Sequence, residues 1–119
     1  MTIRKAGIVD IPLLLRLRMD YLREDKGYMA PEVEAEITRR LEPYFAKHLA
    51  DDTFVCMLAE EDGGVMAVAC LVISEMPPNP SFMNGITGKL VNVLTYPEYR
   101  RPGIGTKVIE QLPRQAKRM

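Results

Sequence analysis

The chain has 119 residues, and its 16 Lys and Arg residues balance 16 Asp and Glu residues, so the net charge is zero. This length predicts one domain, residues 1–119, with a modest core. The balanced charge argues against a nucleic-acid-binding protein that depends on a basic surface. No apolar run approaches the ~20 residues of a membrane span, so we expect neither nucleic acid nor a membrane as a partner.

The N-terminal half predicts a short strand at residues 2–5 and two helices. Asp10 is a good N-cap for the first helix, Pro12 fits its first turn, and Gly27 ends it. The second helix begins near Pro31 with acidic residues in its first turn. Pro43 lies inside its apolar pattern, which predicts a kink or two helical pieces.

Residues 53–59 and 65–74 read as strands rich in β-formers, and Glu61-Asp62-Gly63-Gly64 predicts a hairpin turn between them. If this turn is tight, Cys56 and Cys70 lie near opposite positions but on different faces. We therefore predict buried thiols in a reducing cytoplasm rather than a disulfide. Two cysteines and one histidine also argue against a zinc site, so we expect no metal.

The last third holds the most informative stretch. A proline-rich break at residues 77–80 and a loop through Asn84-Gly85 and Thr87-Gly88 lead into a buried strand, Leu90–Thr95. Pro97 ends this strand because proline cannot donate to a ladder. A loop bearing Gly103 and Gly105 follows and passes into a helix. Strand, glycine loop and helix form an arrangement that binds phosphate, because the first amides of a helix lack internal partners.

Neither of two common phosphate-binding motifs fits this loop. The Gly-x-x-x-x-Gly-Lys spacing of a P-loop is missing, as are the three spaced glycines of a dinucleotide-binding βαβ unit. The string Leu-Thr-Tyr-Pro-Glu-Tyr-Arg-Arg-Pro-Gly-Ile-Gly instead resembles motif A of the GNAT superfamily of N-acetyltransferases. The match rests on Pro97, Arg100, Gly103 and Gly105, with the strand directly upstream.

The resemblance extends loosely over almost the whole chain and implies a fold. We expect an α/β fold of the α+β type, with a mixed, mostly antiparallel central sheet, flanking helices and the order β-α-α-β-β-β-α. The family continues beyond this helix with further strands, whereas this sequence stops at Met119. We therefore expect a GNAT-like domain shortened at its C-terminus, with an open edge on Leu90–Thr95 that predicts a homodimer.

The resemblance also implies a reaction. Acetyl-CoA would be the donor, and a primary amine, on a small molecule or a protein, would attack its thioester directly. By position against motif A, the backbone amide of Val93 would stabilise the oxyanion. Pro102 has no amide to offer, unlike the residue in most relatives. The residues implied in binding the coenzyme are Leu94, Thr95, Arg100, Arg101, Pro102, Gly103, Ile104, Gly105 and Thr106.

The acceptor side is less defined. Tyr28, near the end of the first helix, and Asn92, a polar residue in an apolar strand, are the candidate substrate-binding residues. The position where some relatives carry a glutamate base is Lys89, so the base stays open between Glu24, Asp25 and the loop at residues 77–88. We interpret Tyr21 as a core residue and His48 as a structural residue near a helix C-terminus.

Two other functions remain open. One is a catalytically inactive remnant that binds coenzyme A or a protein partner. The other is a plain interaction domain with an accidental motif. Stabilisation by coenzyme A would separate the last from the other two, and thiol release over a panel of amines would separate an enzyme from a remnant.

Overall fold

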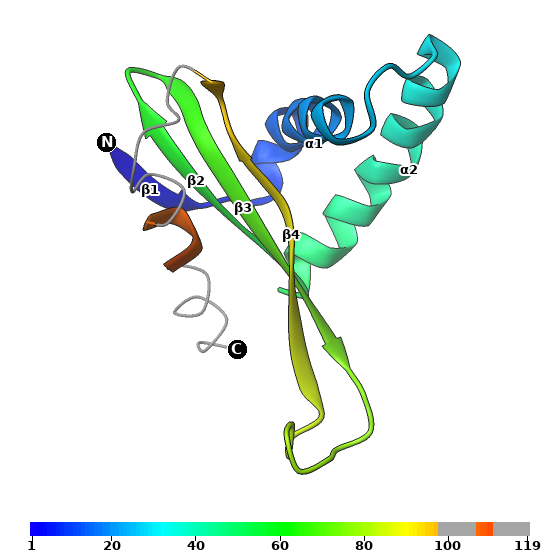
Figure 1. Ribbon diagram of the computed structural model, residues 1–119, viewed down its shortest axis with the longest axis vertical. Helices are drawn as coiled ribbons and strands as arrows, with labels where there is room; N and C mark the ends of the chain where they lie inside the picture. Colours follow the sequence, from blue (N-terminus) through cyan, green and yellow to red (C-terminus); the bar gives the residue numbers. More distant parts are fainter. Residues whose placement is uncertain (98–106, 111–119) are drawn as a thin grey trace.

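The computed structural model describes residues 1–97 and 107–110. The chain forms β1 (Thr2–Lys5), a short 3-10 helix η1 (Ile8–Asp10), α1 (Ile11–Lys26), α2 (Pro31–Ala50), β2 (Phe54–Glu61), β3 (Gly64–Glu75) and β4 (Ile86–Thr95) (Figure 1). Residues 107–110 are helical. This is the predicted element order over the described residues. None of the described helices is long and apolar enough to cross a membrane.

The four strands form one sheet in the order β1-β2-β3-β4, and every pair is antiparallel. Helices α1 and α2 cover one face, while the helical segment 107–110 lies on the other (Figure 1). The core accordingly has two layers. Leu14, Leu17 and Phe45 pack against the first face, and Val108 packs against the second. The sheet is therefore enclosed between helices, as an α+β domain requires.

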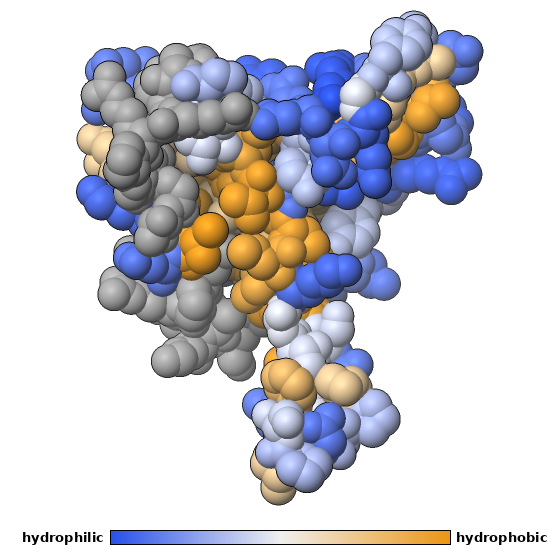
Figure 2. Space-filling view, in the orientation of Figure 1, coloured by the Kyte–Doolittle hydropathy of each residue, from blue (hydrophilic) through white to orange (hydrophobic). Residues whose placement is uncertain are grey.

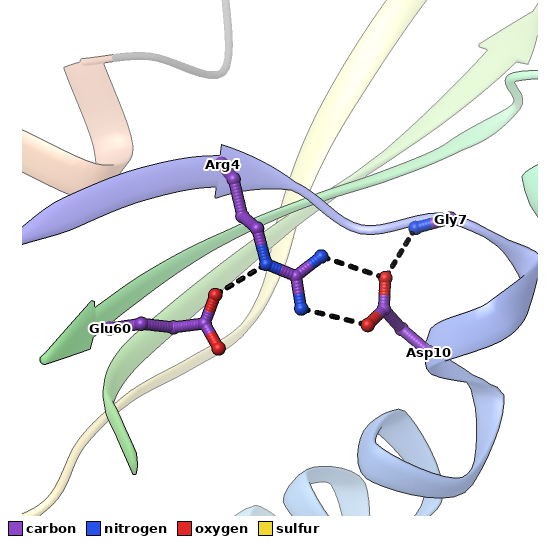
Figure 3. A network of polar contacts seen from close by, with 4 residues as sticks. All are labelled: Arg4, Gly7, Asp10 and Glu60. Carbon is purple, nitrogen blue, oxygen red and sulfur yellow. Dashed lines mark hydrogen bonds and ion pairs between the residues drawn. The ribbon is translucent and has the colours of Figure 1, made fainter. Parts of the chain in front are cut away.

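The entry into α1 is fixed by a polar network (Figure 3). Arg4 of β1 donates two hydrogen bonds to the Asp10 carboxylate, at 2.9 and 2.8 Å, and also contacts Glu60 of β2. Asp10 stands at the predicted N-cap of α1, but its side chain turns back and accepts from the Gly7 amide at 2.8 Å. Arg4, together with the Gly7 amide, lowers the pKa of Asp10.

Helix α2 is one continuous element from Pro31 to Ala50, so of the two outcomes predicted for Pro43, a kink or two helical pieces, the second is wrong. Phe45 and Leu49 are buried after Pro43, and Leu41 packs on the same core before it. These contacts hold both halves against the sheet. Pro43 and Arg39 are exposed, so water can satisfy the carbonyl that the missing proline donor leaves open.

The β2–β3 hairpin has the predicted turn, with Asp62 and Gly63 at φ 51° and 79° as a two-residue hairpin prefers. Its register then shifts: Glu60 pairs with Val65, but Ala59 pairs with Ala67. Met66 is therefore an extra residue in β3, which is a β-bulge.

This bulge overturns the prediction of two separate thiols. Continuing the register from Glu60 and Val65 without a bulge would place Cys56 opposite Ala69 and Cys70 on the other face. With the bulge, Cys56 pairs directly with Cys70. Their Cα atoms are 4.2 Å apart, and the two residues form a buried disulfide. The argument for a reducing cytoplasm, which assumed free thiols, therefore loses its basis.

The β3–β4 hairpin extends away from the rest of the molecule (Figure 1). We predicted a loop up to Gly88, and this is wrong for residues 86–88, which pair with β3 as far as Ile86 and Glu75. Gly85 makes this possible at φ 69°, where an added Cβ would lie 2.4 Å from the Met76 carbonyl oxygen. Only glycine reverses the chain this closely, so the strand starts directly after it.

Candidate functional site

A second β-bulge interrupts β4 in the middle of the sheet. Val91 pairs with Cys70 and Leu94 pairs with Val68, so one β3 residue stands opposite the two residues Asn92 and Val93. Neither of these two has a partner in the pairing with β3. A bulge of this kind locally breaks the ladder and redirects the strand, and it lies at the residue for which a role in the reaction was predicted.

Asn92 is held in an unusual position within the bulge. It is 5% exposed and has φ 54°, a left-handed conformation that asparagine tolerates better than most residues. Its Oδ1 accepts a hydrogen bond from Nη1 of Arg18 in α1 at 3.2 Å. A buried asparagine needs a hydrogen-bond partner, and Arg18 supplies it. This contact ties the bulge to α1.

A polar pocket of about 240 Å³ opens beside the bulge. Val93 is 38% exposed there, and Leu94 lines the pocket next to it. The C-terminal half of α1 contributes the other lining residues, which are Tyr21, Glu24 and Asp25. The structure thus brings the predicted oxyanion residue Val93 together with two of the candidate bases. Tyr21 also packs on the core, as predicted.

A second pocket of about 240 Å³ lies between α1, α2 and the sheet. We call it the Arg18 pocket, after its one charged lining residue. The remaining lining is apolar or aromatic and comes from Leu41, Tyr44, Phe45, Phe54, Val72 and Val91. Burial raises the pKa of the Tyr44 phenol, against the opposing charge of Arg18. The guanidinium carbon of Arg18 lies 5.6 Å from the centre of the Tyr21 ring, so Arg18 and Tyr21 link the two pockets.

Beyond the bulge, Tyr96 fastens the end of β4 to α1. Its O–H donates to Oδ2 of Asp20 at 2.5 Å, and its amide donates to the Met66 carbonyl. Burial, together with the Asp20 carboxylate, raises the pKa of Tyr96 to about 12. The phenol therefore keeps its proton at neutral pH.

Two further residues from the sequence analysis lie away from the bulge. Tyr28 is 89% exposed and lines a third pocket, of about 520 Å³, with Arg23 and Glu34. The structure therefore does not bring Tyr28 together with Asn92. The Nδ1 atom of His48 contacts Oγ1 of Thr53, its ring lies 4.4 Å from that of Tyr44, and it lines none of these three pockets. Its structural role remains the favoured interpretation.

The predicted phosphate-binding residues Arg100, Arg101, Pro102, Gly103, Ile104, Gly105 and Thr106 lie outside the described residues. The helix expected after them is observed at residues 107–110, where Val108 is buried. In the described part of the chain, no three His, Cys, Asp or Glu side chains are grouped so that they could hold a metal ion.

Sequence reasoning missed Arg18, although a signal was present. Arg18 lies four residues after Leu14 and three before Tyr21, so it occupies the face of α1 that packs on the sheet. A cation on an apolar helix face needs a partner or a ligand. The Tyr96–Asp20 contact had no such signal, because it joins residues that are 76 positions apart.

The chain resembles known proteins in both sequence and structure. The model of the acetyltransferase (GNAT) family matches residues 14–119. A structure described as a predicted acetyltransferase with acetyl-CoA, from Clostridium acetobutylicum, is 32% identical. It superposes with a TM-score of 0.81 over 98% of this chain and 73% of that chain. No curated protein matches the chain.

A GCN5-related N-acetyltransferase from Ralstonia eutropha is 26% identical and superposes with a TM-score of 0.82, over 98% of this chain and 76% of that chain. Sequence match, sheet topology and superposition agree over nearly all of the residues compared. The chain belongs to the GNAT family of acetyltransferases.

Proposed function

We propose that this protein, a single domain over residues 1–119, transfers an acetyl group from acetyl-CoA to a primary amine by direct attack. The observation that carries the proposal is the bulge at Asn92 and Val93, in a chain of this family. A bulge leaves backbone groups outside the ladder. A backbone amide fixed in this way can donate to an oxygen that becomes charged during the reaction.

The reaction needs few groups from the protein. The amine nitrogen forms a bond to the thioester carbonyl carbon, and the carbonyl oxygen becomes an oxyanion to which the Val93 amide donates. The C–S bond then breaks and the sulfur leaves as a thiolate. The proton lost by the nitrogen passes to water or to the thiolate, which gives the acetylated amine and coenzyme A. Leu94 and Thr95 would pair through their backbones with the pantetheine arm.

At neutral pH the acceptor is an ammonium ion, which must lose one proton before its nitrogen can attack. The pocket beside Val93 offers groups for this step. Glu24 and Asp25 line that pocket. Their carboxylates favour an ammonium ion nearby and can receive its proton through water. The pyrophosphate would lie against residues 100–106, where Arg100 and Arg101 supply charge-assisted contacts. These residues lie outside the described part of the structure, so their role rests on motif A alone.

Coenzyme A binding and thiol release together test the proposal. We expect coenzyme A to raise the unfolding temperature, and acetyl-CoA plus a panel of amines to release thiol. Gly105→Val should abolish both effects while the variant still folds. Gly7→Val is a matched control, because Gly7 has extended φ −123° and an added Cβ would meet nothing within 4 Å.

Two results would contradict the proposal. Unchanged coenzyme A binding in Gly105→Val would remove the phosphate site from residues 100–106. Coenzyme A binding without thiol release from any amine would favour the alternative of a catalytically inactive protein that binds coenzyme A.

A further inference from the structure

The charge of Arg18 lacks a counterion in the described part of the chain. Arg4, Lys5 and Arg23 each pair with a carboxylate within 4 Å. No such ion pair involves Arg18 among the described residues; its contacts are the neutral Asn92 amide and the face of the Tyr21 ring. A half-buried guanidinium without a carboxylate partner is costly unless a ligand supplies the anion.

The surroundings of Arg18 define what that ligand looks like. The Arg18 pocket is lined by aromatic and aliphatic side chains and by no acidic residue. Arginine has five N–H donors in a planar fork that matches a carboxylate, and one of them is used on Asn92. A molecule that carries a carboxylate next to an apolar group fits both features. At about 240 Å³, the pocket is smaller than the roughly 300–1,000 Å³ typical of ligand sites, so it has room for one apolar or aromatic side chain and not for a larger apolar body.

The position of Arg18 relative to Val93 indicates that the ligand also carries an amine. Arg18 binds Asn92, and Val93 is the next residue in the bulge. One side chain, that of Asn92, therefore separates a carboxylate held on Arg18 from the residue next to the proposed reaction centre. Tyr21, which Arg18 contacts, lines the neighbouring pocket together with Glu24 and Asp25, whose carboxylates suit an ammonium ion. Carboxylate, amine and apolar group are therefore required close together.

We propose that the acceptor is a free α-amino acid with a large apolar or aromatic side chain. Arg18 binds its carboxylate, the Arg18 pocket holds its side chain, and its amine points towards Val93. This inference rests on the proposed function and deepens it by naming the acceptor class. It disfavours polyamines and other polycations, which would bring further positive charge to Arg18.

Binding measured apart from turnover tests the inference. We would titrate phenylalanine, phenylalaninamide, alanine and spermidine into the protein by calorimetry, with and without saturating coenzyme A. Phenylalanine should bind about 10- to 100-fold more tightly than its amide, which lacks the carboxylate but keeps the shape. It should also bind more tightly than alanine, which lacks the apolar side chain.

Arg18→Gln should remove the preference for phenylalanine over phenylalaninamide, while Arg18→Lys should retain part of it. Arg40→Gln is the matched control, because Arg40 is exposed on α2 and pairs with Glu36. It should keep the whole preference. Circular dichroism and thermal unfolding check that each variant is folded.

Several outcomes would overturn the inference: equal binding of acid and amide, a preference that survives in Arg18→Gln, tighter binding of spermidine, or no binding of any of the four. The acceptor class and the proposed function are contradicted by different results. Thiol release from amines regardless of a carboxylate would overturn the acceptor class alone. Binding of phenylalanine through Arg18 without thiol release from any amine would overturn the transferase proposal alone.

Discussion

Tyr96 and Asp20 join the end of β4 to α1 through one hydrogen bond of 2.5 Å. The bond lies just past the bulge, so it helps to hold Val93 against the pocket that α1 lines. Burial and the nearby carboxylate raise the pKa of Tyr96 to about 12, against about 10 in the unfolded chain. A raised pKa means that folding favours the protonated phenol, and its contribution to stability depends on pH.

We predict that Tyr96→Phe lowers the free energy of unfolding by about 1–2 kcal/mol at pH 7, since it removes a hydrogen bond to a charged group. The difference from the unchanged protein should be fully present below pH 10. It should disappear as the pH rises through about 12, where the folded phenol also loses its proton. Urea unfolding at a series of pH values measures it, and Tyr28→Phe, at an exposed phenol, should show no such difference. A difference that persists above pH 12 would refute the assigned bond.

At the scale of elements, the sequence predicted which segments pair and missed how they pair. The helix between the caps Asp10 and Gly27 and the hairpin turn at residues 61–64 follow from local residue preferences, and the structure has both. A bulge depends on one extra residue. Nothing in the local sequence marks Met66 as that residue, because it is apolar among apolar neighbours. The strand that carries Val93 and Leu94 could thus be located from the sequence, but the bulge that interrupts its pairing with β3 could not.

The disulfide tests the shifted register of β2 and β3. We predict that the denatured, unreduced protein shows no reactive thiol and that reduction exposes two. Cys56 and Cys70 are 14 positions apart, and opening a loop of this size should lower the free energy of unfolding by about 2–3 kcal/mol. A Cys56→Ala, Cys70→Ala double variant is the control, and the reducing agent should leave its stability unchanged. Two free thiols without reduction would contradict the disulfide and remove this support for the shifted register.

The molecule as a whole is more extended than its length requires. Its radius of gyration is 15.0 Å, against about 13.5 Å for a compact chain of this length, and the β3–β4 hairpin projects from the body (Figure 1). Within the described residues, β4 pairs with β3 alone and forms an edge of the sheet. Figure 2 shows apolar surface over the middle of the sheet on this side of the molecule. Ile86 and Leu90 of β4 are 48% and 43% exposed.

An apolar edge strand is a template for pairing with a second chain. We therefore predict a homodimer that uses β4, in a closed two-fold arrangement. Light scattering at micromolar concentration should give twice the mass of the chain, and Leu90→Lys should shift the protein towards the monomer. Val9→Lys, at an exposed apolar residue of η1, should leave the mass unchanged. A monodisperse monomer that unfolds cooperatively would rule the dimer out.

The extra residue Met66 also changes which side chains of β3 face the helices. Before it, the odd-numbered Val65 faces α1 and α2; after it, the even-numbered Val68, Cys70 and Val72 do so. Met66 and Ala67, although consecutive, both face the opposite layer. Loss of Met66 alone would therefore leave Val65, Ala67 and Val68 in regular alternation, each on the face that it has now. Deletion of this one residue is therefore expected to remove the bulge and to keep Cys56 opposite Cys70, whereas a strand of the present length without a bulge would place the two cysteines on opposite faces.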